Sequence, residues 1–381
     1  MRIGIDIRSL QNESRDRGIG TYTRCLVEHL LAIDKYNEYI FFAFRNQDLP
    51  QICNIYPRIK ENTVGITWRH KHFMWISGQC LFPYAAKRYK LDIFYSPEYI
   101  VPVGARAKKV ITVHDFITRD YPVYRSRSTP IHKGYFFLRD STLHFADCVI
   151  AVSRYTKQKT IELTGVNPDK IRVIYEGAAP VFIPLSDKES IRKRIRQRYG
   201  IGEDFFLYIG AIDYHKNIDG LLKSFAQLKR KDVALVIVGR PVYRRYTTRI
   251  YAQSNALVKD GRKVYFLGYL CQRELADLYN AAVSFVSVSV YEGFGLPALE
   301  AMACGTPVIA AGNTSMREIV DSSGILVDPY NTEEITSAME NLLSDDALRN
   351  RLSRQALIRA KEFSWEKAAR ETLSVYEELA G

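Results

Sequence analysis

The sequence predicts an α/β protein with two doubly wound parallel sheets in succession, and three observations support this fold class. First, 381 residues exceed the usual size of one domain, so two domains are expected. Second, 47% hydrophobic and 25% charged residues is an ordinary globular composition, with ample apolar surface for two cores. Third, short β-branched apolar runs alternate with segments of helical period, as βαβ units require.

The N-terminal half shows this alternation with long basic loops. Its candidate strands are Ile3–Ile7, Ile40–Ala43, Asp92–Tyr95, Val110–Val113, Cys148–Val152 and Ile171–Ile174. A helix is expected over Thr21–Ala32, preceded by the loop Arg17-Gly-Ile-Gly-Thr21, whose amides could face a phosphate or a sugar. The loop is no dinucleotide fingerprint, because it lies well after the first strand and has no third glycine.

The C-terminal half shows the same pattern more clearly. Its apolar runs are typical of buried parallel strands: Phe205–Ile209, Val233–Val238, Val264–Leu267, Val283–Val288, Val308–Ala310 and Ile325–Val327. Helical periods lie at Ile218–Leu228, Arg273–Ala281, Leu296–Cys304 and Thr332–Leu343. The junction of the two halves is expected near Pro180–Glu189, before a charged helix at Ser190–Tyr199, and a last amphipathic helix at Trp365–Leu379. Two such sheets in succession make a cleft between domains, where ligands tend to bind.

Charge and cysteine content narrow the classes of function. The net charge of +12 belongs mainly to residues 1–180, which hold 27 Lys and Arg against 17 Asp and Glu. A positive field of this kind suits nucleic acid, an anionic membrane surface or a phosphate-bearing substrate. The six cysteines are scattered without a CxxC pair, and we expect free thiols in a reducing cytoplasm. Neither a signal-peptide layout nor an apolar run of about 20 residues is present.

The segment Ser289–Glu300 carries the strongest functional signal. It follows an apolar strand, so it lies at the carboxyl end of a strand in a parallel sheet, where ligands gather. Gly293 and Gly295 allow a tight turn, and Pro297 fits the first turn of a helix whose positive dipole end faces an anion. Glu300 is expected in that first turn, and both Glu292 and Glu300 are expected to face one crevice. Carboxylates beside an anion cradle are suited to the diol and diphosphate of a nucleotide sugar.

Glu292 and Glu300, with seven residues between them, are similar to the Glu-x7-Glu motif of retaining glycosyltransferases with the GT-B fold. The chain resembles their large group 1 family, which includes many bacterial polysaccharide mannosyltransferases. The likeness covers nearly the whole chain and is carried further by Tyr208–Asn217, Phe266–Leu270, Glu300–Val308, Arg317-Glu318 and Phe363–Trp365.

The resemblance implies two Rossmann-like domains facing a central cleft. Residues 1–185 would bind the acceptor, residues 186–364 the nucleotide-sugar donor, and a helix in 365–381 would pack back toward the N-terminal domain. Glu300 would bind the donor ribose and Glu292 the hydroxyls of the donor sugar. The donor-binding residues expected on this basis are Gly18, Gly20, Lys216, Tyr269, Glu292, Gly293, Phe294, Gly295, Leu296 and Glu300, and the catalytic residues are Glu292, Lys216 and His114.

Lys216 follows the strand Phe205–Ile209, where an ammonium can neutralise a departing diphosphate. Many relatives carry an arginine where this chain has Ala211, and His215 or Arg240 could supply the missing charge. His114 ends the strand Val110–Val113, and we assign it a positioning role rather than nucleophilic attack. The sequence has no Asp-x-Asp pair of the kind that holds a metal on a diphosphate, so we expect no metal and no cofactor beyond the GDP- or UDP-linked donor.

A basic and aromatic region between Arg58 and Lys90 and a second one at Arg119–Arg127 could contact an anionic membrane surface or nucleic acid, or simply pack on the core. The expected partners are a nucleotide sugar and a saccharide or lipid-linked acceptor, without nucleic acid. The expected location is the cytoplasm, with peripheral binding to the inner face of the cell membrane as a candidate.

Two other classes of function are open. A nucleotide-sugar epimerase or oxidoreductase is disfavoured because neither half begins with a proper Gly-x-Gly-x-x-Gly turn, and NAD binding would distinguish it. A nucleic-acid-binding protein is disfavoured because no nucleic-acid motif accompanies the charge. The favoured hypothesis is a retaining, metal-independent hexosyltransferase of cell-surface polysaccharide or glycoconjugate synthesis, with mannose slightly ahead of other sugars.

Overall fold

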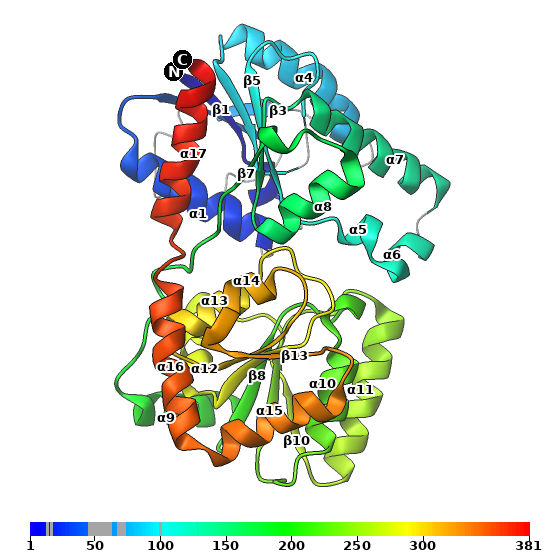
Figure 1. Ribbon diagram of the computed structural model, residues 1–381, viewed down its shortest axis with the longest axis vertical. Helices are drawn as coiled ribbons and strands as arrows, with labels where there is room; N and C mark the ends of the chain where they lie inside the picture. Colours follow the sequence, from blue (N-terminus) through cyan, green and yellow to red (C-terminus); the bar gives the residue numbers. More distant parts are fainter. Residues whose placement is uncertain (13–14, 16–17, 45–62, 67–73, 99–100, 128) are drawn as a thin grey trace. The chain divides into compact units, whose positions relative to one another are not determined.

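The computed structural model describes residues 1–12, 15, 18–44, 63–66, 74–98, 101–127 and 129–381. The chain divides into two compact units (Figure 1). Unit 1 comprises Met1–Gly177 together with Ser364–Gly381, and unit 2 comprises Ala178–Phe363.

Unit 1 is built on a parallel sheet that has seven strands within the described residues. The strand order is β3-β2-β1-β4-β5-β6-β7. The strands are β1 (Arg2–Asp6), β2 (Glu38–Phe44), β3 (Thr63–Ile66), β4 (Ile93–Ser96), β5 (Lys108–Val113), β6 (Cys148–Ala151) and β7 (Ile171–Val173). The order reverses between β1 and β4, which makes this sheet doubly wound.

Helices cover both faces of this sheet. On β4, Phe94 packs against Phe82 of α4, whereas the next residue, Tyr95, packs against Tyr376 of α17. Successive side chains of a strand point to opposite faces, so α4 and α17 lie on different sides of the sheet. α17 packs along α1. The helices are α1 (Gly18–Ile33), α4 (Met74–Arg88), α5 (Ile117–Asp120), α6 (Pro122–Arg127), α7 (Pro130–Ser141), α8 (Arg154–Thr164) and α17 (Trp365–Ala380), with 3₁₀ turns η1 (Arg8–Leu10), η3 (Thr142–Phe145) and η4 (Pro168–Lys170).

Unit 2 repeats the architecture with a parallel sheet of order β10-β9-β8-β11-β12-β13. Its strands are β8 (Phe205–Ile209), β9 (Ala234–Val238), β10 (Lys263–Phe266), β11 (Ser284–Ser287), β12 (Val308–Ala311) and β13 (Ile325–Val327). Its helices are α9 (Lys188–Tyr199), α10 (Ile218–Ala226), α11 (Arg244–Lys259), α12 (Gln272–Ala281), α13 (Leu296–Ala303), α14 (Met316–Val320), α15 (Thr332–Ser344) and α16 (Asp346–Ala360), with 3₁₀ turns η5 (Tyr214–Lys216) and η6 (Asp321–Ser323).

The core of unit 2 also has two sides. Phe285 of β11 contacts Tyr279 of α12, whereas Val286 belongs to the apolar cluster that includes Leu221 of α10 and Met339 of α15. The sheet is therefore buried on both faces, which explains why its strands are nearly continuous apolar runs in the sequence. The prediction of two doubly wound parallel sheets is confirmed.

Two details differ from the sequence prediction or lie outside the described residues, whereas the described cysteines agree with it. Gly18 and Gly20 lie in the first turn of α1, which begins three residues before the expected start, so they do not form a loop. Most of the basic segment Arg58–Lys90 before Met74 lies outside the described residues, and its later part forms α4. The described cysteines are free thiols, and Cys53 lies outside the described residues.

Within the described part of the chain, none of the helices combines the length and the hydropathy needed to cross a bilayer.

Candidate active site

The candidate site of unit 2 lies where the strand order of its sheet reverses. β8 and β11 are neighbours there, with Ser284 opposite Phe206 and Phe285 opposite Leu207. Lys216 follows β8 and Glu292 follows β11, and their Nζ and Oε1 atoms are 2.6 Å apart. Both side chains are largely buried, with 17% and 15% of their surface exposed. The ion pair therefore joins the two loops that follow β8 and β11, at the reversal of strand order where doubly wound sheets tend to bind their ligands.

Local capping fixes the position of Lys216. The Asp213 carboxylate accepts a hydrogen bond of 2.7 Å from the Tyr214 amide and begins η5, of which Lys216 is the last residue. Asn217 follows in the left-handed conformation, with φ of 52°, and caps α10 by accepting from the Gly220 amide. Its side-chain amide also donates to the Pro329 carbonyl at 2.7 Å. Lys216 thus stands between two fixed turns.

The loop that carries Glu292 is held from two sides. The Val290 amide donates to the His215 carbonyl at 2.8 Å, which ties this loop to the Lys216 turn. The buried Ser315 hydroxyl lies 3.0 Å from the Glu292 carbonyl and 2.9 Å from the Phe294 carbonyl. Asn313 donates to the Val290 carbonyl at 3.1 Å. Asn313 and Ser315 were not predicted from the sequence, although a Gly-Asn-Thr-Ser turn directly after a strand is a recognisable signal.

Gly295 sets the start of α13. Its φ of 107° is a conformation that glycine adopts readily, and a Cβ at this position would overlap the sulfur of Met316. Leu296 is the first helical residue and Pro297 the second, as Pro tolerates. Gly295 has no side chain to cap the helix. Because α13 begins at Leu296, the positive end of its dipole lies next to the loop of Gly293 and Phe294.

Glu300 is the fifth residue of α13, so the prediction that it lies in the first turn was wrong. It is 9% exposed, and its Oε2 accepts a hydrogen bond of 3.0 Å from the Tyr279 hydroxyl. Burial and then the charge of Glu300 hold the pKa of Tyr279 well above its usual value, so the phenol remains a donor. Tyr279 of α12 therefore orients Glu300, a contact that the sequence did not reveal. Glu292 and Glu300 have separate partners.

Two more expected groups lie after β9 and β10. The Arg240 guanidinium lies 4.4 Å from the ring centroid of Tyr269, a residue that is about half exposed. Gly239, the residue before Arg240, lies so close to the Gly210 carbonyl that a Cβ would overlap it. Burial and then Lys216 lower the pKa of His215 well below its usual value. His215 is therefore neutral and does not replace the charge of the arginine expected at Ala211.

In unit 1, His114 lies at the end of β5 and is buried. Its Nε2 donates to the Pro97 carbonyl at 2.9 Å, and its Nδ1 is 3.7 Å from an Oε1 of the buried Glu176. Burial opposes the charged imidazole, but Glu176 more than offsets it and the pKa of His114 is raised. Burial also raises the pKa of Glu176. Because Nε2 carries a proton toward Pro97, the second proton of a charged imidazole would lie on Nδ1, on the side of Glu176. Glu176, after β7, was not foreseen.

Gly18 and Gly20 lie at the N-terminal end of α1, with Gly18 exposed and Gly20 buried. Across the described residues, no three His, Cys, Asp or Glu side chains gather in a group suited to a metal ion.

Two Rossmann-like units and a charged site at the carboxyl edge of the second sheet define the architecture of GT-B glycosyltransferases. The family of glycosyl transferases group 1 matches residues 191–359, and Glycosyltransferase Family 4 matches residues 17–180. The chain belongs to the group 1 glycosyltransferases and is a glycosyltransferase enzyme.

Individual relatives support this assignment. The chain is 30% identical to the O-antigen chain mannosyltransferase B of Escherichia coli over 95% of its own length and 96% of that protein. It is 26% identical to the serotype-specific mannosyltransferase WbdA of Escherichia coli, over 97% of its own length but 47% of that longer protein. Among solved structures, Alr3699/HepE of Anabaena, in complex with UDP and glucose, has a TM-score of 0.77 at 18% identity over 99% of both chains.

Proposed function

We propose that this enzyme transfers a hexose, foremost mannose, from a nucleoside diphosphate sugar to a saccharide or lipid-linked saccharide, with retention of the anomeric configuration. The observation that carries the proposal is the Lys216–Glu292 pair across the reversal of strand order, beside the positive end of α13. A cation, a carboxylate and a helix dipole end together match a diphosphate joined to a sugar.

Donor binding exchanges the partner of Lys216. Without donor, the ammonium is bound to Glu292 at 2.6 Å. A diphosphate at the N-terminus of α13 offers two negative charges to the same ammonium, so Lys216 turns to the phosphate and Glu292 becomes available to the sugar hydroxyls. The amides of Gly293, Phe294, Gly295 and Leu296 contact the phosphates or the sugar.

Glu300 and Tyr269 hold the nucleoside. Tyr279 occupies one oxygen of Glu300 and leaves the carboxylate oriented for a ribose diol. The half-exposed ring of Tyr269 offers a face to the base.

Bond breaking rests on electrostatics. Lys216 and the α13 dipole stabilise the negative charge that develops on the leaving diphosphate, which therefore requires neither a metal nor a cofactor. The leaving diphosphate accepts the proton of the attacking hydroxyl, since none of the predicted site residues is placed as a base. For unit 1, a role of His114, Gly18 and Gly20 in donor binding stays a prediction from the sequence.

Mannose is favoured because a relative that matches this chain over nearly its whole length is an O-antigen chain mannosyltransferase. We accordingly place GDP-mannose ahead of UDP-sugars as donor, and the acceptor among growing cell-surface polysaccharides or their lipid-linked precursors.

Calorimetry with GDP, UDP, ADP and dTDP tests the donor site. We expect one nucleotide to bind with a Kd of about 1 μM, roughly −8.2 kcal/mol, and Glu300→Ala to weaken it at least about tenfold, since a charged hydrogen bond is worth about 1.5–3 kcal/mol. Tyr279→Phe, which only removes the orienting hydroxyl, should cost about threefold, near the low end of a neutral hydrogen bond. If no nucleotide binds, the proposed function is wrong.

Transfer itself is measured with GDP-mannose and UDP-glucose on oligosaccharide acceptors. We expect a product whose anomeric coupling matches that of the donor, and unchanged turnover after EDTA treatment. An inverted product would refute retention, and activity that returns only with added Mg²⁺ or Mn²⁺ would refute metal independence.

A further inference from the structure

The hydroxyl of Ser315, between β12 and α14, bridges two carbonyls of the loop that carries Glu292. It lies 3.0 Å from the carbonyl oxygen of Glu292 and 2.9 Å from that of Phe294. Ser315 is fully buried, and the two carbonyls are 23 and 21 positions away in the sequence. The contact is therefore a long-range one, which exists because β11 and β12 are neighbours in the sheet.

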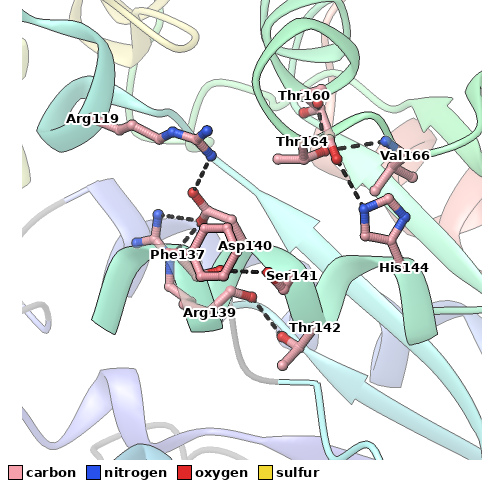
Figure 2. Close-up of polar contacts among 10 residues, drawn as sticks. All are labelled: Arg119, Phe137, Arg139, Asp140, Ser141, Thr142, His144, Thr160, Thr164 and Val166. Carbon is pink, nitrogen blue, oxygen red and sulfur yellow. Dashed lines mark hydrogen bonds and ion pairs between the residues drawn. The ribbon is translucent and has the colours of Figure 1, made fainter. Parts of the chain in front are cut away.

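Hydroxyl groups at helices commonly bond to the backbone of the same helix. Figure 2 shows an example in α7 of unit 1, where Ser141 donates to the Phe137 carbonyl at 2.7 Å. Ser315 directly precedes the first residue of α14, a position at which a serine oxygen usually accepts a hydrogen bond from an amide of the first helical turn. It makes no such bond. The Ser315 hydroxyl is thus used for the Glu292 loop and not for its own helix.

The backbone beside Ser315 is strained. Thr314 has a φ of 50°, in the left-handed region where β-branched residues are rarely found. Both sides of this turn are fixed by the fold, because the Gly312 amide donates to the Val327 carbonyl of β13 at 2.7 Å and the Ile319 amide donates to the Ser315 carbonyl at 3.0 Å. The surrounding structure therefore imposes a conformation that the residue itself disfavours, a feature that is concentrated at functional sites.

The direction of the two bridged carbonyls determines where the neighbouring amides point. In a trans peptide unit, the C=O of one residue and the N–H of the next point to opposite sides. Because the carbonyls of Glu292 and Phe294 are turned toward the buried Ser315 hydroxyl, the amides of Gly293 and Gly295 point away from it. Two amides that point to the same side, directly before a helix N-terminus, form a concavity suited to an anion.

We propose that Ser315 is a positioning residue for the donor diphosphate. By holding two carbonyls on the buried side of the loop, it presents the amides of Gly293 and Gly295 to the phosphates before the donor binds. Amides that are already oriented need no rearrangement when negative charge develops on the leaving group. Without the hydroxyl, the two peptide units are free to rotate, and the amides no longer point to the same side. The inference rests on the proposed function and adds to it a residue that acts through the loop without touching the substrate.

The affinity for a nucleoside diphosphate, compared with that for its nucleoside, tests this role. Calorimetry with GDP, UDP, ADP and dTDP identifies the preferred diphosphate, and displacement of that diphosphate measures the affinity of the matching nucleoside. We expect Ser315→Ala to weaken the diphosphate at least about tenfold and the nucleoside less than about twofold, because only the phosphates reach the amides. A purely structural role of Ser315 would weaken both ligands by the same factor.

Ser284→Ala is the matched control. Ser284 is also fully buried, and its hydroxyl lies 3.0 Å from the Phe285 carbonyl and 2.9 Å from the Pro307 carbonyl. The variant removes the same kind of contact from the same unit, but at the first residue of β11, at the opposite end of the strand from the Glu292 loop. We expect both alanine variants to lower the thermal midpoint, since each leaves buried carbonyls without a partner, and only Ser315→Ala to change the ratio of the two affinities.

A milder variant covers the case in which Ser315→Ala does not fold. Ser315→Cys keeps a side chain of similar shape with a weak S–H donor, and we expect it to lower the ratio of diphosphate to nucleoside affinity by about threefold. A wild-type ratio in the folded Ser315 variant, or equal losses of both affinities, would overturn the inference. If the wild-type protein bound none of the four nucleotides, the proposed function would fail, and the inference that rests on it would fail too.

Discussion

At the scale of single residues, the Lys216–Glu292 pair has both a structural and a functional consequence. Lys216→Met keeps the length of the side chain but removes its charge, and leaves the largely buried Glu292 carboxylate without its 2.6 Å partner. We expect a loss of about 1–3 kcal/mol in unfolding free energy, partly restored by adding Glu292→Gln. We also expect kcat to fall on the order of 10²-fold or more, because the stabilisation of the leaving diphosphate is lost.

Chemical denaturation and steady-state kinetics measure the two effects. Lys223→Met is the control, since Lys223 pairs with Asp219 in an exposed i,i+4 geometry and should change stability by less than about 0.5 kcal/mol. If Lys216→Met retained wild-type kcat, Lys216 would have no part in bond breaking.

The His114–Glu176 pair predicts a pH dependence of stability in unit 1. The raised pKa values of both groups mean that the folded state holds a shared proton that the unfolded chain releases near pH 6.5. This contribution is fully present below that pH and is lost as the pH rises through the folded-state pKa. The imidazole also lies near Glu98, Asp115 and Tyr22, and a change of Glu176 alone leaves these three residues unaltered.

Glu176→Gln should remove this dependence. We expect the thermal midpoint of wild-type unit 1 to fall more steeply between pH 6 and pH 9 than that of Glu176→Gln. Scanning calorimetry measures the midpoint, and hydrogen exchange of unit 1 peptides assigns the change to this unit. Parallel pH profiles for the two proteins would show that the two groups do not share a proton.

At the scale of elements, α13 depends on the conformation of one residue. Gly295→Ala introduces a Cβ at φ of 107° that also meets Met316, and both effects disfavour the start of the helix. We expect a loss of about 1–3 kcal/mol and a larger fall in nucleotide affinity than stability alone explains, since the turn positions the α13 amides. Gly202→Ala is the control, because its Cβ would make ordinary contacts at 3.5 Å without positive φ. Calorimetry with the preferred nucleotide compares the two variants. Equal nucleotide affinity of Gly295→Ala and Gly202→Ala would contradict the prediction.

Apolar runs predicted most strands well, and Phe205–Ile209 and Ile325–Val327 are β8 and β13 without change. The buried two-faced sheet explains this success, since such strands need continuous apolar sequence. β3 was missed because it is a short strand at the sheet edge, paired with β2. α11 was missed because Tyr246, Thr247 and Ser254 are among its buried residues, which hides the apolar period of its inner face.

The site was predicted less completely than the fold. Glu292 and Lys216 were singled out from local motifs because each follows a strand, and Glu300 because it lies in the helix that contains Pro297. Their partners could not be predicted, since they depend on which strands become neighbours. Lys216 meets Glu292 across 76 positions of sequence only because β8 lies beside β11. The exposure of Phe137 and Leu138 could not be predicted either, because large apolar residues are usually buried and these two lie on the surface.

At the scale of the whole molecule, the chain leaves unit 1 and returns to it. The backbone at Gly177 lies so close to Ser364 and Trp365 that a Cβ there would overlap them, so the exit and the return are adjacent. α17 then packs along α1, with Trp365 2% exposed and its ring 5.6 Å from that of Tyr22. Tyr376, fully buried on the same helix, lies 5.7 Å from Tyr95 of the sheet. The last 18 residues thus complete a fold that begins at the first residue.

Removing residues 364–381 should therefore unfold unit 1 and spare unit 2. Burying Trp365, Val375 and Tyr376 contributes roughly 1.5–3 kcal/mol each, a sum comparable with the whole stability of a domain. Hydrogen exchange on the 1–363 chain should show loss of protection in peptides of β1, β4 and α1, with protection retained in β8, β11 and α13.

The fragment 178–363, which is continuous in sequence, should fold alone and bind the nucleotide with reduced affinity. Trp365→Ala is the milder version and should cost unit 1 about 3–5 kcal/mol. Unchanged protection of β1 and β4 in the truncated chain would mean that unit 1 is stable without α17.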